Sequence, residues 1–323
     1  MKTAVIIPNY NGAEMLTKCL ESLAAQTRPP DSIIVVDNGS ADGSAEAAEN
    51  HSCRPLVIRL GENTGFARAA NQGILNSDAD LIALLNNDAE AMPGWMEAGI
   101  AAARSHPLVY LFASLMLDKK DPSLVDSAGD VYCRDGRPRP RGRGKPAAMY
   151  SEESEVISPC AGAAFYRRAL FEEAGLFEEG FFSYLEDVDL GLRARARGHA
   201  CLFVPGARVL HTGAATHLGD RQGKKNVDSA KRVRWIARNR IRVVARNWPS
   251  GFMIIWMPLL LLGLVRSAAY HVLVSRQGRP FFSGIMDGLK MFAADRAYFK
   301  KDRNKKSFQE TARIMRQGGG PWQ

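Results

Sequence analysis

Short apolar runs alternate with amphipathic stretches over the first third of the chain. Apolar runs rich in β-branched residues predict strands, and apolar positions spaced three or four residues apart predict helices. The predicted strands are 4–7, 33–36, 56–60 and 81–85, and the predicted helices are 15–25, 44–49, 66–75 and 95–103. This alternation is typical of an α/β fold, in which a mostly parallel central sheet is covered by helices on both faces.

The next part of the chain is less regular. An apolar run covers 108–117, and residues 134–145 form a basic, proline-containing loop that we interpret either as a mobile flap or as a solvated surface. Structure resumes over 156–167, a helix begins near Glu186, and a last strand over 200–204 is followed closely by His211.

The character of the chain changes after about residue 217. Residues 224–246 hold nine basic residues and one acid, and the basic positions recur along one face of a predicted helix at Lys231, Arg234, Arg238, Arg242 and Arg246. An uncharged apolar run of 14 residues, 252–265, follows. It is shorter than the roughly 20 residues of a spanning helix, and extending it to Val274 includes Arg266 and His271. We expect an interfacial or partly inserted segment beside a basic stripe that attracts anionic headgroups, with a buried core helix as the alternative.

This organisation predicts a domain over 1–217, with halves at 1–90 and 91–217, and a helical, membrane-associated extension over 218–323. The net charge of +9 indicates anionic partners. Apart from Trp235, no aromatic residues are interleaved with the basic stripe, so nucleic acid is not expected among them. Five cysteines without a CxxC pair argue against a zinc ribbon or a disulfide framework and favour a reducing compartment.

Polar residues follow the predicted strands, at the end where open α/β sheets bind ligands. Asp37 follows the second strand and can accept hydrogen bonds from a base or from ribose hydroxyls, although turn and cap chemistry explains it equally well. Asn86, Asn87 and Asp88 follow the fourth strand. Such an oxygen-rich cluster can hold a divalent cation that bridges a diphosphate, and a simple turn is the alternative.

Two further candidates lie in the second half. Glu186, Asp187 and Asp189 crowd three carboxylates near a helix start, which raises at least one pKa and suits a general base. Acids are also favoured in any first helical turn. His211 can add a ligand for Mn²⁺ or Mg²⁺, although a lone histidine is more often structural. The absence of P-loop and GxGxxG patterns argues against an ATPase and against a dinucleotide-dependent oxidoreductase.

Taken in order, these residues resemble the family-2 inverting glycosyltransferases, which have the Rossmann-like GT-A fold. The resemblance covers about the first two thirds of the chain. It implies that Glu186 and Asp187 form the acidic motif, with Asp187 the catalytic base, and that Asp88, His211 and Asn86 hold a divalent cation, Mg²⁺ or Mn²⁺. It also implies donor contacts, which fall at Pro8, Asn9, Tyr10, Asp37, Asn63, Gly65, Asn71 and Asn87.

One departure narrows the resemblance. Asn86 stands where the family's metal motif has its first aspartate, and Asn-Asn-Asp is similar to rhamnosyltransferase-like members that build O-antigen and related polysaccharides. The implied reaction moves rhamnose from dTDP-rhamnose onto a glycan acceptor, often polyprenyl-diphosphate-linked, at the cytoplasmic face of the inner membrane, with the enzyme peripheral or monotopic. The alternatives are another sugar such as galactofuranose, glucose or N-acetylhexosamine, a nucleotidyltransferase, and an inert membrane-bound glycan-recognition protein.

Overall fold

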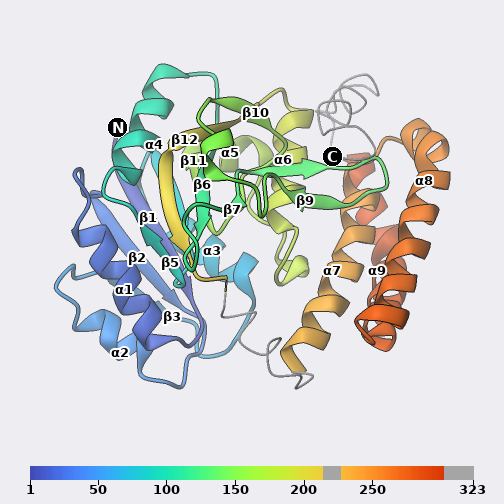
Figure 1. Cartoon of the computed structure of the whole chain (residues 1–323), viewed down its shortest axis with the longest axis horizontal. Coiled ribbons are helices and arrows are strands. Elements are labelled where there is room, and N and C mark those ends of the chain that lie inside the picture. Colours follow the sequence, from blue (N-terminus) through green and yellow to red (C-terminus); the bar gives the residue numbers. More distant parts are fainter. Residues whose placement is uncertain (214–226, 302–323) are drawn as a thin grey trace.

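The computed structural model describes residues 1–213 and 227–301 (Figure 1). The strands are β1 Thr3–Asn9, β2 Ser32–Asp37, β3 Leu56–Arg59, β4 Leu81–Leu85, β5 Ala89–Ala91, β6 Leu111–Asp118, β7 Val125–Ser127, β8 Asp130–Tyr132, β9 Pro138–Pro140, β10 Ser154–Val156, β11 Ala163–Arg167 and β12 Cys201–His211. The α-helices are α1 Ala13–Ala24, α2 Ser44–Glu49, α3 Phe66–Leu75, α4 Trp95–Ser105, α5 Arg168–Ala174, α6 Glu186–Ala196, α7 Val227–Asn247, α8 Ser250–Ala269 and α9 Gly278–Lys301.

Ten strands form one central sheet in the order β10-β12-β6-β11-β4-β1-β2-β3, with β5 on β12 and β7 on β6. Strands β1 to β4 pair in parallel, as the sequence predicts. The second half is mixed, because β11 runs antiparallel between β4 and β6 while β12 runs parallel to β6. The segment before β11 therefore lies beside the residues that follow β4, and this arrangement places the site.

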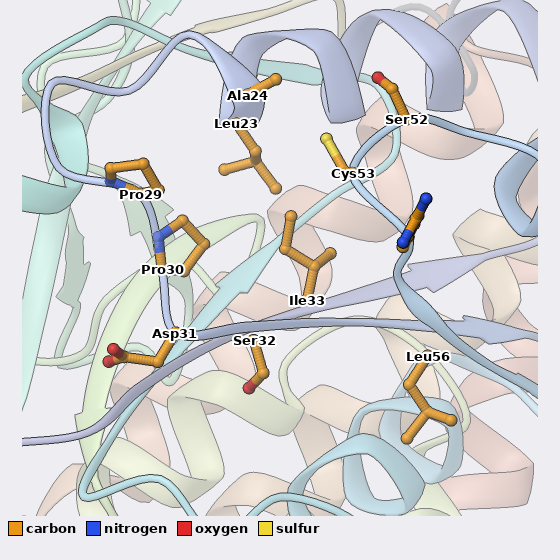
Figure 2. A pocket seen from close by; sticks show the side chains of 11 residues that line it. Leu23, Ala24, Pro29, Pro30, Asp31, Ser32, Ile33, Ser52, Cys53 and Leu56 are labelled. Carbon is orange, nitrogen blue, oxygen red and sulfur yellow. The ribbon is translucent and has the colours of Figure 1, made fainter.

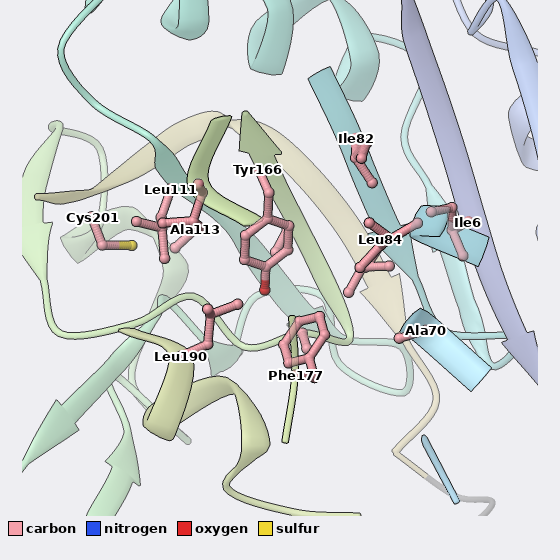
Figure 3. Packing of buried hydrophobic residues seen from close by; sticks show 14 of the residues in the cluster. Ile6, Ala70, Ile82, Leu84, Leu111, Ala113, Tyr166, Phe177, Leu190 and Cys201 are labelled. Atoms are coloured by element: carbon pink, nitrogen blue, oxygen red, sulfur yellow. The ribbon is translucent and has the colours of Figure 1, made fainter. Parts of the chain in front are cut away.

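Helices cover both faces of the sheet. Alternate residues of one strand point to opposite faces, so Ile6 packs in one core with α3, α5 and α6, whereas Ile7 packs in the other with α1 and α4. Figure 3 shows the first core, a cluster that holds Ile6, Leu84 and Tyr166 from the sheet and Leu190 of α6. Helix α6 is thus fixed against the sheet by its apolar side.

The predicted elements are confirmed over the first half, with helix 66–75 and strand 81–85 matching to the residue. The prediction missed β5, which is only three residues long. It also ended the last strand at 204, whereas β12 continues to His211 through an irregularity between Val204 and Arg208. His211 is therefore the last residue of a strand, which fixes the direction of its side chain.

The extension shares a hydrophobic core with the rest of the protein. Trp248 and Phe252 pack in one buried cluster with Tyr132, Phe181 and Val188. Figure 1 shows α7, α8 and α9 together at the end of the molecule opposite α1 and α2. The predicted boundary at 217/218 lies outside the described residues, but the cluster joins both sides of it.

The interpretation of the basic stripe as a headgroup-binding face is wrong for its C-terminal part. Arg242 and Arg246 are 3% and 5% exposed. Arg242 pairs with Asp295 of α9 at 2.8 Å, and Arg246 pairs with Asp189 of α6 at 3.1 Å. These arginines are buried because carboxylates of neighbouring helices face them, so the stripe attaches α7 to the protein. Lys224, where the basic segment begins, lies outside the described residues.

Helix α8 has an unusual distribution of apolar side chains. Phe252, Leu260 and Gly263 are buried, while Ile254, Leu262 and Val265 on other faces are at least half exposed. By length and composition, Ser250–Val274 is the one helical segment in the described part of the chain that can cross a membrane, and only 17% of its most apolar stretch is buried. This surface requires a partner if it is to leave water.

Candidate functional site

Polar residues gather where β1, β2 and β4 end, along one edge of the sheet. Asn87 donates from Nδ2 to Asn9 Oδ1 at 2.8 Å, and Asn9 donates from its own Nδ2 to Asp37 Oδ1 at 3.2 Å. Strand β1 lies parallel to both β2 and β4, so its end is the middle of this edge. The hydrogen-bond chain fixes the three strand ends relative to one another, at the edge where open α/β sheets bind ligands.

The predicted donor contacts on β1 and β2 differ in exposure. Tyr10 is 51% exposed, whereas Asn9 and Asp37 are 1% and 3% exposed. The second carboxylate oxygen of Asp37 accepts from the Ser40 N–H at 3.2 Å, so both oxygens have partners within the protein. Asn9 and Asp37 therefore help to build the edge. Their contact with a donor stays a prediction, as does that of Pro8, Tyr10 and Asn87.

Three further predicted donor contacts lie in or before α3. Asn63 accepts from the Gly65 N–H at 3.0 Å and closes the turn that starts the helix. Gly65 has a φ of 89°, and a Cβ there would collide with the Phe182 carbonyl oxygen. Asn71 is 2% exposed, donates to the Phe177 carbonyl at 2.9 Å and accepts from the Phe177 N–H at 3.0 Å. The position of Asn71 gives no support to a donor contact, while Asn63 and Gly65 stay predictions.

Asp88 and His211 meet at the same edge, as predicted. Strand β12 pairs with β5, which places His211 opposite Ala89. His211 Nε2 lies 3.2 Å from Asp88 Oδ1, and both side chains are largely buried. The contact does not have the geometry of a hydrogen bond, and Nε2 has no such partner among the described residues. A buried nitrogen and a carboxylate oxygen therefore form a close charged contact that lacks hydrogen-bond geometry.

The other ring nitrogen of His211 contacts Asp126, which the sequence did not single out. Nδ1 lies 2.9 Å from Asp126 Oδ2, and Arg143 donates to Asp126 Oδ1 at 2.7 Å. Burial alone would raise the pKa of Asp126, but the hydrogen bond from His211 and the charge of Arg143 lower it to about 2. An ionised carboxylate only accepts, so Nδ1 carries a hydrogen and Nε2 is the nitrogen that faces Asp88. Burial lowers the pKa of His211, whereas Asp126 and Asp88 raise it to about 9, so without a cation the ring is protonated at neutral pH and faces both carboxylates. A cation bound at Nε2 would take the place of the hydrogen there.

This pair fits a divalent cation that takes further ligands from a substrate. Within 1–213 and 227–301, no three His, Cys, Asp or Glu side chains are arranged to hold a metal ion. Mg²⁺ and Mn²⁺ commonly use one or two protein ligands plus water and substrate phosphates. A ligating histidine usually donates its other N–H to a carboxylate, as His211 does to Asp126. Asn86 directs Nδ2 toward Gly162, and its part as a ligand stays a prediction.

Glu186 and Asp187 begin α6, as predicted. Asp187 accepts from the Ala161 N–H at 3.1 Å and from the Val188 N–H at 2.8 Å. Burial raises the pKa of Asp187 although these hydrogen bonds oppose the shift. Glu186 is 5% exposed, and burial followed by the charge of Asp187 raises its pKa well above the usual range. A carboxylate with a raised pKa accepts a proton more readily near neutral pH, which fits the predicted general base.

The third acid of the motif does not share this environment. Asp189 is fully buried and accepts from Arg193 at 2.8 Å and from Arg246 at 3.1 Å. Burial alone would raise the pKa of Asp189, but the charges of these two arginines hold it below its ordinary value. Asp189 therefore stabilises the contact between α6 and α7, and the predicted crowding involves Glu186 and Asp187.

The segment before β11 connects the two acidic groups. Ala161 holds the Asp187 carboxylate, and the neighbouring Gly162 carbonyl accepts from the Asn86 N–H at 2.9 Å, two residues before Asp88. Cys160, directly before Ala161, lies near the same acids. Burial raises the pKa of its thiol, and the charges of Asp130, Asp187 and Asp126 raise that pKa further. Asp187 and the Asp88–His211 pair therefore belong to one edge of the sheet.

The interpretation of the basic loop 134–145 as a mobile flap is wrong, because contacts hold this segment at both ends. Strands β8 and β9 form a hairpin through it. The Asp135 carbonyl accepts from Arg240 of α7, and the Arg134 guanidinium lies 4.9 Å from the ring centre of Trp256 on α8. At its other end, Arg143 pairs with Asp126. The hairpin is held at both ends and reaches from the histidine site to the extension.

A separate pocket of about 450 Å³ lies at the opposite end of the strands (Figure 2). Pro30, Asp31 and Ile33 at the beginning of β2, with Leu56 of β3, line it. It holds none of the predicted site residues and lies away from the carboxyl ends of the parallel strands.

Sequence reasoning missed Asp126 and Asp130. Asp130 is 7% exposed, accepts from Ser158 Oγ at 3.1 Å, and has its pKa raised by burial and by the charge of Asp187. The run Asp126-Ser-Ala-Gly129-Asp130 gave a weak signal, because two acids flank a glycine that has a φ of 85°. Acids beside glycine are also ordinary turn residues, so the pattern did not identify either role.

Comparison with known proteins shows the family to which the chain is similar. Residues 4–175 match the family model described as glycosyl transferase family 2. The N-acetylglucosaminyl-diphospho-decaprenol L-rhamnosyltransferase of Mycobacterium tuberculosis is 29% identical over 231 residues, covering 64% of this chain and 75% of that protein.

Solved structures share the fold at low identity. GalNAc-T7 with UDP, GalNAc and Mn²⁺ is 17% identical with a TM-score of 0.62, covering 98% of this chain and 57% of that one. The mannosyltransferase PcManGT of Pyrobaculum calidifontis, in complex with GDP-Man and Mn²⁺, is 16% identical with a TM-score of 0.54, covering 94% and 88%. The chain therefore has the GT-A type of fold.

Proposed function

The chain belongs to glycosyl transferase family 2, and from this premise we propose that it transfers rhamnose from dTDP-rhamnose to a lipid-linked glycan with inversion at the anomeric carbon. The observation that supports the site assignment is the meeting of Asp88 Oδ1 and His211 Nε2 at 3.2 Å. Residues 161–162 connect this pair to Asp187, since Ala161 donates to Asp187 and Gly162 accepts from Asn86. In this arrangement a cation-binding pair and a proton acceptor serve one reaction centre.

Each group has one role in the proposed mechanism. Asp187 takes the proton of the acceptor hydroxyl while that oxygen forms a bond to the anomeric carbon and the bond from that carbon to the diphosphate breaks. A divalent cation held by Asp88 and His211 would neutralise negative charge on the leaving diphosphate. Asp126 keeps Nε2 of His211 directed at Asp88 through the hydrogen bond at Nδ1. The strand-end network of Asn9 and Asn87 holds the edge rigid for the donor.

The choice of sugar and acceptor rests on two supports. The Mycobacterium tuberculosis relative is named as a rhamnosyltransferase that acts on an N-acetylglucosaminyl-diphospho-prenol. The sequence Asn86-Asn87-Asp88, with asparagine in place of the first aspartate, also resembles the motif of rhamnosyltransferase-like members of the family. We therefore expect a prenyl-diphosphate glycan to present its terminal hydroxyl to Asp187.

An acceptor anchored in lipid requires the enzyme at a membrane surface, and the extension supplies a suitable face. Ile254, Ile255, Leu262 and Val265 of α8 expose 54–77% of their surface. The exposed charged side chains within 250–300 are all basic: Arg266, Arg276, Arg279, Lys290 and Lys300. Apolar side chains rimmed by cations match an anionic bilayer surface. We therefore propose that α8 and the chain after it contact the membrane, and that the buried arginines of α7 do not.

A donor panel tests the reaction. Purified protein with Mn²⁺ or Mg²⁺ and a short-chain prenyl-diphosphate N-acetylglucosamine is given dTDP-rhamnose, UDP-galactofuranose, UDP-glucose or UDP-N-acetylglucosamine, and products are identified by mass spectrometry. We expect rhamnose transfer by the wild type. Asp187→Asn should lower turnover about a hundredfold or more with donor affinity unchanged. Transfer of another sugar would overturn the donor assignment, and wild-type turnover in Asp187→Asn would remove the base.

Vesicle sedimentation tests the membrane contact. The wild type should bind phosphatidylglycerol vesicles more strongly than phosphatidylcholine vesicles, because the rim is basic. Leu262→Glu should release it by placing a charge on the apolar face. Leu108→Glu, at an 85% exposed leucine near the start of β6, is the matched control and should bind as the wild type does. Equal binding of both variants would contradict the assigned face.

A further inference from the structure

The turn that leads into the catalytic helix has a strained backbone. Phe182, Tyr184 and Leu185 have φ values of 63°, 71° and 68°. Non-glycine residues rarely adopt positive φ, and bulky ones do so only where surrounding contacts hold them. Leu185 is also the N-cap residue of α6, directly before its first residue Glu186. The direction in which α6 starts, and with it the position of Asp187, therefore depends on whatever keeps this turn in place.

Asn239 of α7 makes the most direct contact with this turn. It is fully buried, and its Nδ2 lies 3.0 Å from the Phe181 carbonyl oxygen, 2.9 Å from that of Ser183 and 2.7 Å from that of Tyr184. Three acceptors share the two hydrogens of one amide, so a single side chain satisfies most of the carbonyl groups of the turn. An amide is suited to this task because it donates from one nitrogen without carrying a charge.

Neighbouring residues of α7 grip the same turn. Arg238 Nη2 donates to the Phe181 carbonyl at 2.6 Å, and the Trp235 ring lies 4.6 Å from the ring of Phe182. Trp235 and Asn239 are four residues apart and so share one face of the helix. From the opposite side, the Ala67 N–H donates to the Phe182 carbonyl at 3.1 Å. The turn is thus held between α7 and the start of α3.

Helix α7 also holds α6 beyond the catalytic residue. Asp189 accepts from Arg246 at 3.1 Å and from Asn247 at 2.8 Å. The two attachments, one on the turn before Asp187 and one at Asp189 after it, come from the same helix. Residues 4–175 carry the family match, so α7 lies beyond it.

We propose that Asn239 is a positioning residue of the active site, which sets the Asp187 carboxylate by holding the strained turn 181–185. The C-terminal extension then has a part in catalysis besides membrane contact. This inference rests on the proposed role of Asp187 as the base. Loss of the amide should misplace that carboxylate with little effect on donor binding, since Asp88 and His211 make no hydrogen bond or ion pair with α7 among the described residues.

The experiment compares turnover, donor affinity and thermal unfolding for Asn239→Asp and Asn239→Ser. Asp removes both donors at nearly constant shape, and Ser is a smaller replacement that keeps one hydroxyl donor in case the first variant does not fold. A misplaced catalytic group costs up to about a hundredfold, so we expect kcat to fall between about tenfold and a hundredfold for Asp and less for Ser. The donor Kd should change less than about twofold. The control is Arg234→Ala, on the same helix as Asn239, which removes the pair with Asp287 of α9 and should retain wild-type kcat.

A double variant distinguishes positioning from general damage. If Asn239 acts through Asp187, then Asn239→Asp should slow the Asp187→Asn enzyme no further. Full additivity, or an unchanged kcat in both folded Asn239 variants, would overturn the proposal. A parallel loss of donor affinity and unfolding temperature would do the same. Wild-type turnover of Asp187→Asn alone would instead remove the base, and so separates failure of the proposed function from failure of this inference.

Discussion

Removal of the Asp126 carboxylate tests how the cation pair is built. Asp126 Oδ2 accepts from His211 Nδ1 at 2.9 Å and, being ionised, fixes which ring nitrogen faces Asp88. In Asp126→Ala this acceptor is lost, and the ring can rotate or take the other tautomer. A hydrogen bond to a charged group contributes about 1.5–3 kcal/mol. At about 1.4 kcal/mol per factor of ten, cation affinity should fall roughly 10- to 100-fold.

Titration with Mn²⁺, followed by electron paramagnetic resonance in the presence of dTDP, measures this affinity without turnover. Asp126→Asn retains an acceptor oxygen but not the charge, so its affinity should lie between those of the wild type and Asp126→Ala. Arg143→Ala removes the other partner of Asp126 and leaves the contact with His211 intact. It should bind Mn²⁺ within about threefold of the wild type, because the Arg143 side chain is half exposed and water screens its charge. Equal affinity for the wild type and Asp126→Ala would show that Asp126 does not orient His211 for the cation.

The other predictions concern the cation, the buried ion pairs and the glycine under the turn. Asp88→Ala should lower cation-dependent turnover at least about a hundredfold, and activity insensitive to both chelators and this change would contradict the pair. Asp189→Asn leaves Arg193 and Arg246 without their shared counter-charge, so urea unfolding should show a loss of about 3–5 kcal/mol at pH 7. The folded pKa of Asp189 is lowered, so its contribution is present above about pH 4 and is lost as the pH falls further; the difference between wild type and variant should shrink there. Gly65→Ala adds a Cβ against the Phe182 carbonyl at a φ of 89°, and should cost about 1–3 kcal/mol and lower kcat; unchanged values of both would argue against a rigid turn.

The sequence predicts well those features that are encoded locally. Continuous apolar runs with polar residues directly after them identify β1, β2 and β4 and place Asn87 and Asp88 at one edge, because parallel strands share the edge at which they end. The position of Glu186 and Asp187 is predicted because the apolar face of a helix begins at these residues. The position of His211 close to the end of a strand is also predicted. The length of β12 is not, because the irregularity near Val204 interrupts the apolar pattern of the strand.

Long-range contacts explain what the sequence does not predict. In the sequence, Asp126 cannot be told from an ordinary turn residue. It lies beside His211 only because β7 and β12 each pair with β6. Arg242 and Arg246 have the spacing of a solvated basic stripe, and only the positions of Asp189 and Asp295 show that they are buried. Asn239 carries no local signal, because its partners are carbonyl groups of a distant turn. Side chains that act through another element therefore require the tertiary structure.

In the proposed site, Asp88 and His211 hold the cation that contacts the donor diphosphate. A crystal grown with Mn²⁺ and dTDP, with anomalous data collected at the manganese absorption edge, would locate that cation. We expect one anomalous peak within ligand distance of Asp88 Oδ1 and His211 Nε2, in contact with the diphosphate of the nucleotide. A nucleotide bound elsewhere, or manganese bound away from these two atoms, would contradict the proposed site.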